Sequence, residues 1–119
     1  MVQPSWQAEI LVEVGRLYNR KHYPKLIWRN GSRPSSSGHY YPKKKRIVVT
    51  AGTSGKDHEQ VLLHELAHWL TPRSRAHGRR FWQVLYRLLE HFKIRDEEYV
   101  KREFRYMKMA ETVYQELYS

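Results

Sequence analysis

The stretch from Asp57 to Leu70 constrains the fold of this chain most, because it predicts a helix with two different faces. Asp57 is typical of a helix N-cap, Gln60 three residues later completes a capping box, and Pro72 requires the helix to end before it. One face collects leucines, which predict contact with a hydrophobic core. These are Leu62, Leu63, Leu66 and Leu70. The opposite face is left free to carry chemistry.

That opposite face carries the sequence His64-Glu65-Leu66-Ala67-His68, an H-E-x-x-H pattern. Four residues turn a helix by about 400°, so the two histidine side chains differ by about 40° in direction and about 6 Å along the axis. Their imidazoles can therefore converge on one metal ion. Glu65 borders the same face, where a carboxylate can take a proton from water and pass it to a leaving amine.

Two histidines do not complete a catalytic zinc site, which needs three protein ligands and one open position for water. His77 is the best third ligand, because the polar loop after His68 can bring it back to the helix just before Gly78 begins the next one. Glu90 is the second choice, and His91 is less suitable. A bound zinc ion lowers the pKa of its water to about 7 and polarises a scissile carbonyl. Candidate oxyanion stabilisers are Tyr86, Arg79 and Tyr106.

Two plainer interpretations of this motif stay open. A pair of helical histidines is often a half-exposed surface pair that binds nothing. The motif can also hold a structural zinc ion, although Glu65 would then have no role.

The remaining segments predict a single α+β domain over residues 1–119, with its core in 5–92. Apolar residues at helical spacing predict a helix from Trp6 to about Arg20, with Ser5 as its N-cap. Further helices are expected over 78–92 and, as one C-terminal helix, over 96–118. A short strand is expected at Leu26–Trp28, and residues 39–50 predict a β-hairpin that turns at a run of lysines.

Composition excludes several classes of protein. The chain has 119 residues and no cysteine, so it holds no disulfide scaffold, catalytic thiol or cysteine zinc ribbon. No apolar run approaches the roughly 18 residues of a membrane span, and the N-terminus has no signal-peptide layout. We therefore expect a cytoplasmic monomer with no membrane contact.

The charge balance is strongly basic, with 22 Lys and Arg against 12 Asp and Glu and a net charge of +10. Such a field attracts polyanions, nucleic acid among them. The candidate contacts are Lys43, Lys44, Lys45, Arg46, Arg73 and Arg75. A lysine-rich hairpin tip is also ordinary protection against edge-to-edge pairing, and the arginines can be a solvated loop. The aromatic residues Trp28, Tyr40 and Tyr41 can stack bases, but packing of a small sheet is their commoner role.

Beyond this, the chain resembles a known family. His64-Glu65-Leu66-Ala67-His68 followed by His77-Gly78-x-x-Phe81-Trp82 resembles the SprT-like zinc metallopeptidases and the related YgjP-type proteins. Upstream, Gly38-His39-Tyr40 and Ile47-Val48-Val49 are similar to the strands of that family. The resemblance covers about residues 26–92.

The resemblance implies a small zincin-like domain: an N-terminal helix, a short antiparallel sheet, and the metal-binding helix packed beneath it, here followed by two further helices. It implies that His64, His68 and His77 bind Zn²⁺ and that Glu65 is the general base. Some SprT-like proteins act on proteins bound to DNA, which would suit the basic charge. The final segment, 96–119, matches no pattern of the family.

These observations favour a zinc-dependent metallopeptidase that acts on a protein or peptide substrate, with DNA-associated proteins as one substrate class. The alternative is a basic nucleic-acid-binding protein whose zinc site is structural or vestigial. A third hypothesis is a zinc hydrolase that attacks amides outside proteins.

Overall fold

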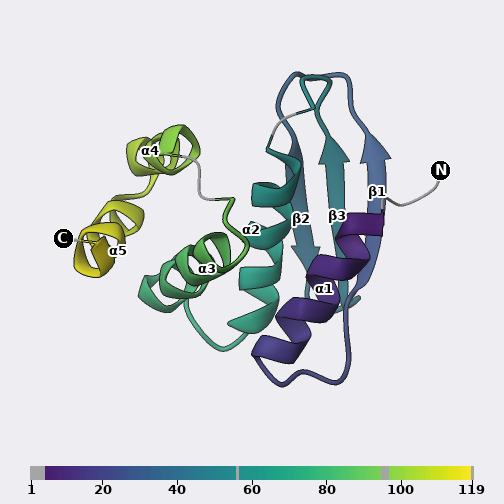
Figure 1. Cartoon of the computed structure of the whole chain (residues 1–119), viewed down its shortest axis with the longest axis horizontal. Helices are drawn as coiled ribbons and strands as arrows, with labels where there is room; N and C mark the ends of the chain where they lie inside the picture. Colours follow the sequence, from purple (N-terminus) through teal and green to yellow (C-terminus); the bar gives the residue numbers. More distant parts are fainter. Residues whose placement is uncertain (1–4, 56, 95–96, 119) are drawn as a thin grey trace.

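The computed structural model describes residues 5–55, 57–94 and 97–118, and within them it shows an α+β fold. One helix precedes three strands, and four helices follow (Figure 1). The elements are α1 (Ser5–Leu17), β1 (Lys25–Asn30), β2 (Ser37–Tyr41), β3 (Arg46–Ala51), α2 (His58–Leu70), α3 (Arg79–His91), α4 (Glu97–Tyr106) and α5 (Lys108–Tyr118). None of the described helices is long and apolar enough to cross a bilayer.

The three strands form one mixed sheet in the order β1-β3-β2. The predicted hairpin is confirmed: β2 and β3 are antiparallel, with Tyr41 opposite Arg46 and the lysine run in the turn. The expectation of an antiparallel sheet is wrong, however, because β1 pairs with β3 in parallel, from Lys25 opposite Arg46 to Asn30 opposite Ala51. Strand β3 is the most apolar strand, and the central position buries both of its faces.

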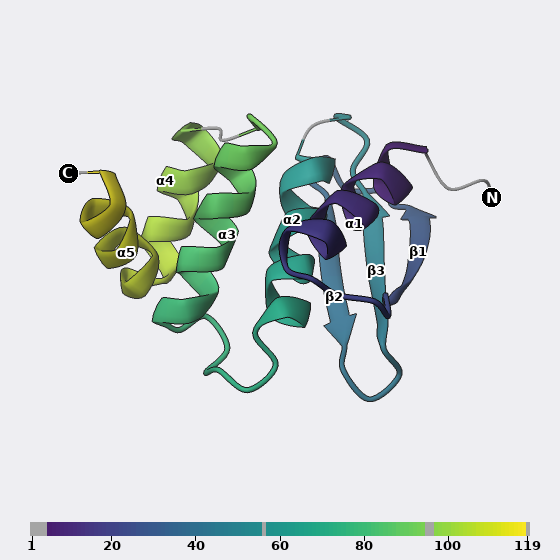
Figure 2. The same ribbon diagram turned by 60° about the horizontal axis from the view of Figure 1, so that its bottom comes forward.

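Helices α1 and α2 cover one face of this sheet, so the metal-motif helix does pack against the strands as expected (Figure 2). The core between them is built from inward-facing residues of the sheet and the two helices. Its fully buried members include Val14, Ile47, Val49, Leu62, Leu63 and Leu66. Helix α3 packs on the other side of α2, and α5 packs on α3. Helix α2 therefore lies between the sheet and the C-terminal helices.

The expected single C-terminal helix is divided in two at Met107. Its N–H donates to Glu103 O at 2.9 Å, and Ala110 N–H donates back to Met107 O at 3.0 Å. A straight helix over 96–118 would be about 34 Å long, whereas the 13 residues of α3 extend for about 20 Å. The break lets α4 fold back on α5, so that Val100 and Val113 are both buried.

The start of α2 differs from the predicted capping box. Asp57 adopts a left-handed conformation with φ 58°, and its side chain makes no capping hydrogen bond. Its carboxylate instead accepts a hydrogen bond from Ser36 N–H at 3.2 Å, and the Gln60 amide donates to Ile94 O at 3.4 Å. Both residues of the predicted box therefore connect α2 to other segments.

Gln7 on α1 is fully buried, and neither its amide nitrogen nor its amide oxygen has a hydrogen-bond partner among the described residues. Because leaving buried polar atoms unpaired costs about 1–3 kcal/mol, Gln7→Met, a change of similar shape, should raise the free energy of unfolding by that amount. Urea unfolding measures it. The matched change Gln83→Met on the half-buried side of α3 should stay within about 0.5 kcal/mol of wild type. A destabilised Gln7→Met protein contradicts the prediction.

Candidate metal centre

Three histidines converge at the middle of the molecule. His64 Nε2 and His68 Nε2 lie 3.2 Å and 3.0 Å from His77 Nε2. One ligand atom from each ring lies within 4.8 Å of those of the other two. Among the described residues this is the only cluster of histidine and acidic side chains arranged to hold a metal ion. The structure thus brings together the three ligands that the spacing predicts.

The turn after α2 explains why His77 returns to the helix. Thr71 ends α2 with its hydroxyl bonded to Ala67 O at 2.7 Å, and Ser74 N–H then donates to Thr71 O at 3.2 Å. His77 itself is left-handed, with φ 56°, a conformation in which histidine is tolerated better than most residues. Its carbonyl accepts a hydrogen bond from the Trp82 indole at 3.0 Å. The reversal is therefore fixed on both sides of the imidazole.

The buried ring of Phe81 lies against all three imidazoles. It stacks on His68 with the centroids 4.3 Å apart, and it meets His64 and His77 edge-on at 4.9 Å and 5.0 Å. This apolar surface limits the positions that the three rings can take. It also removes water from beneath them.

Burial sets the protonation of the cluster. Loss of solvent, assisted by the neighbouring histidines, lowers the pKa of His64 to about 3 and that of His68 to about 4. Burial also lowers the pKa of His77. All three rings are therefore neutral at pH 7, the form in which imidazole nitrogen binds a metal.

Glu65 is buried on α2, only 7% exposed, between His64 and strand β2. Desolvation raises its pKa to about 7, although a hydrogen bond from the main chain of Tyr40 acts in the opposite direction. Gly38 makes this position possible, because a Cβ atom there would lie 3.0 Å from Glu65 Cγ and 3.2 Å from Oε2. The absence of a side chain at Gly38 thus lets the strand lie against the carboxylate.

A pocket of about 450 Å³ opens over this cluster. Its walls come from β2, from the β2–β3 turn, from α2 and from the α2–α3 loop. The lining residues include His39, Tyr40, Pro42, Glu65, Thr71, Ser74 and the three histidines. A smaller pocket of about 150 Å³ shares Gly38, His64 and Glu65 with it and reaches Arg102 and Glu103 on α4. The largely buried Glu65 and His64 therefore border a pocket on two sides.

The raised pKa of Glu65 predicts a pH dependence for the stability of the metal-free protein. Its pKa rises from 4.5 to about 7 on folding, so the native state holds a proton that the unfolded chain releases. This contribution to the free energy of unfolding is complete below about pH 4.5 and is lost as the pH rises through 7, a change of about 3 kcal/mol. Glu65→Gln does not titrate there. Between about pH 4.5 and 8 it should gain that amount relative to wild type in denaturant titrations. A constant difference between the two proteins would show that Glu65 titrates normally.

Two of the three candidate oxyanion donors, Tyr86 and Arg79, do not line this pocket. Tyr86 is buried, and its hydroxyl donates to Ala110 O at 2.7 Å between α3 and α5. Arg79 is exposed and forms an ion pair with Glu116 on α5. The side chain of Tyr106 lies outside the described residues. Spacing alone could not separate them, because the contacts of Tyr86 and Arg79 come from α5.

Neither alternative third ligand reaches the cluster. Glu90 lies near the C-terminal end of α3 and accepts a hydrogen bond from the Tyr118 hydroxyl at 3.1 Å. His91 Nε2 lies 3.7 Å from Glu13 on α1. Since His77 is just before the opposite end of α3, about 20 Å away, these residues belong to a different part of the surface.

The basic residues border the pocket but do not line it. The exposed lysines Lys43, Lys44 and Lys45 form the β2–β3 turn after Pro42, and the exposed Arg73 and Arg75 alternate with Pro72, Ser74 and Ala76, which do line the pocket. Arg46 is half-buried, with its guanidinium 5.4 Å from the Tyr41 ring centre. Trp28 packs against Trp6 and His58, so it is part of a different cluster.

The sequence alone did not predict three parts of this site: Gly38, His39 and the main chain of Tyr40. His39 lines the pocket and lies close enough to His68 to lower its pKa. The sequence signal that could have identified all three is the Gly38-His39-Tyr40 segment itself. A single glycine within a strand indicates that another element approaches closely.

The comparisons leave the family of this chain open. No protein-family model, no curated protein and no solved structure matches it.

Proposed function

We propose that this protein is a zinc-dependent peptidase, the function that the sequence motif and its resemblance to SprT-like metallopeptidases predict. The observation that supports it most is the meeting of three neutral imidazoles and one carboxylate of raised pKa in a single open pocket. A structural site would not need a poised acid–base group beside the ligands. A surface histidine pair would not recruit a third ring from a separate loop.

The donor set fits zinc. Tetrahedral Zn²⁺ with nitrogen ligands at about 2.0–2.1 Å requires the nitrogens to be about 3.3 Å apart. The distances of 3.2 Å and 3.0 Å from His77 Nε2 to the other two rings are close to this value. Zinc held by His64, His68 and His77 supplies a Lewis acid for a substrate carbonyl and for water.

The residues of the chain itself then carry the proton and position the substrate. Glu65, with a pKa of about 7, can accept a proton at neutral pH and return it to the leaving amine. The hydrogen bond from the Tyr40 main chain holds its carboxylate in place. His39, in the pocket wall near His68, takes the place of Tyr86 and Arg79 as the candidate donor to the developing oxyanion.

A peptide is the substrate that the pocket suits best. Strand β2 is an edge strand of the sheet, and Gly38, His39 and Tyr40 of this strand line the pocket. In an antiparallel pair, alternate residues direct their main-chain groups away from the partner strand. An extended peptide can pair with such an edge, which would place its carbonyls beside the three histidines.

The proposal is tested by metal content and hydrolysis together. Protein purified without added metal should contain about one zinc per chain, and it should cleave a disordered protein substrate. A chelator should abolish cleavage and zinc should restore it. Protein that is folded, metal-free and unable to take up zinc would refute the metal site. A zinc-loaded protein without hydrolysis of any peptide would refute the peptidase while leaving the metal site standing.

The second candidate, polyanion binding, is supported by the position of the basic residues. Lys43–Lys45 and the two arginines Arg73 and Arg75 belong to the two segments that enclose the pocket. Nucleic acid bound there would lie beside the pocket mouth, as expected for a peptidase that acts on DNA-associated proteins.

Salt dependence and matched variants test this candidate. Binding to duplex DNA should weaken steeply with salt because phosphate contacts release counterions. Replacing Lys43, Lys44 and Lys45 with glutamine should reduce the slope of this salt dependence by the equivalent of about three phosphate contacts. The control replaces Lys21, Lys101 and Lys108, exposed lysines elsewhere, and removes the same charge. Equal losses in both variants would mean that only the net charge matters.

A further inference from the structure

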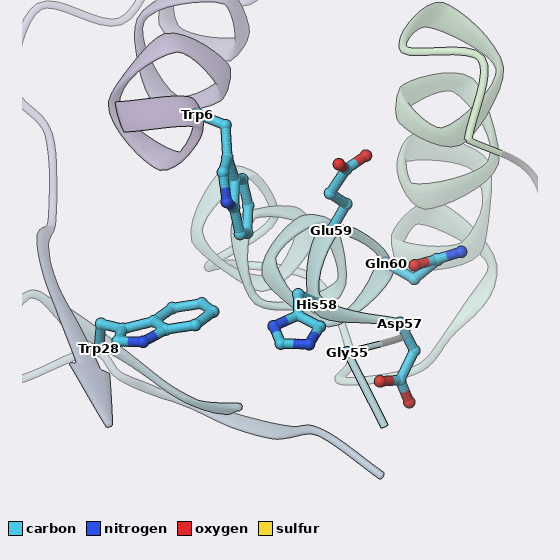
Figure 3. A pocket seen from close by; sticks show the side chains of 7 residues that line it. All are labelled: Trp6, Trp28, Gly55, Asp57, His58, Glu59 and Gln60. Carbon is cyan, nitrogen blue, oxygen red and sulfur yellow. The ribbon is translucent and has the colours of Figure 1, made fainter. Parts of the chain in front are cut away.

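A second pocket lies at the start of α2, where this helix meets α1 and β1 (Figure 3). Its volume is about 330 Å³, near the lower end for small-molecule sites, and it shares no lining residue with the histidine pocket. The lining residues are Trp6, Trp28, Gly55, Asp57, His58, Glu59 and Gln60. A space of this size suits one side chain or a ligand of similar bulk.

Aromatic rings form the walls of this pocket. Trp6 and Trp28 stand nearly perpendicular, at 87°, with their centroids 5.8 Å apart. The His58 ring stacks on Trp28 at 5.3 Å and 20°. Indole faces attract cations through their quadrupole, and Trp is the strongest of the side chains in this respect. Both tryptophans are only half-buried, so their rings remain accessible from the pocket.

The pocket also carries a carboxylate, that of Glu59 in the first turn of α2. The Glu59 side chain extends on the Trp6 side of the pocket, away from the His58 ring (Figure 3). It makes no ion pair or hydrogen bond within the described residues. Two of the other polar side chains already have partners: Asp57 contacts Ser36 and Arg102, and Gln60 donates to Ile94 O. In a chain of net charge +10, a carboxylate with no partner among the described residues, in a pocket walled by indoles, points to a cationic ligand.

The Glu59 carboxylate narrows the choice of cation. A quaternary ammonium has no N–H to donate to it. A guanidinium has five N–H donors, stacks on aromatic faces, and sheds its hydration more easily than the ammonium of lysine.

We propose that this pocket binds a guanidinium group, as presented by an arginine side chain of a peptide or partner protein. The guanidinium stacks on the indole face of Trp6, next to the wall formed by Trp28 and His58, and donates hydrogen bonds to the Glu59 carboxylate. This site is independent of the histidine centre and does not depend on the peptidase activity.

Titration of the full chain with N-acetyl-arginine amide tests the proposal by NMR. The indole N–H signals of Trp6 and Trp28 should shift with a Kd of about 0.5 mM, the affinity expected for a ligand of this size. Trp69 and Trp82, which lie outside the pocket, are internal controls and should not shift. The amides of N-acetyl-lysine and N-acetyl-trimethyllysine should bind at least about fivefold more weakly.

Matched variants assign the contacts. Glu59→Gln should weaken binding by about tenfold, whereas Glu111→Gln, which also removes a glutamate from the first turn of a helix, should not. Trp6→Leu should weaken binding while the remaining spectrum shows an intact fold. The proposal is overturned if Trp6 and Trp28 do not shift at about 10 mM probe, if trimethyllysine binds as tightly as arginine, or if both glutamate variants behave alike.

Discussion

Glu65→Gln is expected to lower kcat for peptide hydrolysis by about 10²–10⁴-fold while the protein keeps its zinc. Glutamine has nearly the same shape and can still accept the hydrogen bond from the Tyr40 main chain, but it cannot take a proton from water. Because Glu65 is not one of the three converging ligands, metal content should be unchanged. Steady-state kinetics and metal analysis on the same sample measure both effects.

The control for this prediction is Glu111→Gln, an exposed glutamate on α5 outside both pockets that contain Glu65. Its activity should equal that of wild type. If Glu65→Gln retains activity within about tenfold of wild type, another group carries the proton and the role given to Glu65 is wrong. If it loses zinc as well, the carboxylate supports the metal site directly.

His77→Ala is expected to weaken zinc binding by about a hundredfold or more, because a zinc site shares its binding free energy among only three or four ligands. Hydrolysis should be lost at zinc concentrations that saturate wild type. The increase in melting temperature on adding zinc should shrink accordingly. Competition with a coloured chelator gives the affinity, and thermal unfolding with and without zinc gives the second readout.

His91→Ala is the appropriate comparison, since His91 was an alternative ligand by sequence but lies next to Glu13 on α1. It should bind zinc as wild type does. Unchanged zinc affinity in His77→Ala would mean that the turn after α2 plays no part in the metal site, and the peptidase proposal would then lose its main support.

The local features of the site were accessible from sequence because they depend on helical geometry. A four-residue separation places His64 and His68 on one face of any helix, and a loop of this length permits His77 to return. The hairpin at the lysine run was equally local. The structure has all three features, while the binding of zinc and the chemistry stay predictions.

The features that sequence reasoning missed depend on contacts between distant segments. The parallel pairing of β1 with β3 follows from the need of β3 for two partners, which no short pattern encodes. Asp57 resembles an N-cap locally, but its carboxylate accepts a hydrogen bond from Ser36, twenty-one residues earlier. The break at Met107 likewise follows from the packing of α4 and α5 against each other.

The environment of Glu65 combines both cases. Glu65 was identified from its motif alone, whereas its raised pKa requires burial against β2, and that burial requires Gly38. A glycine in a strand indicates a close approach without saying what approaches. Only the pairing of β2 with β3 and the packing of α2 on both strands place the carboxylate there.

The central position of α2 also governs how the protein opens. The sheet covers one side of this helix and α3 covers the other, and even the residues between its histidines, Leu66 and Ala67, are fully inaccessible. Local fluctuations that expose such a segment must separate both layers at once. Amide hydrogens of α2 should therefore exchange with solvent only through cooperative unfolding of the whole domain. A chain in which His64 and His68 lie together on this helix is then also a chain that is completely folded.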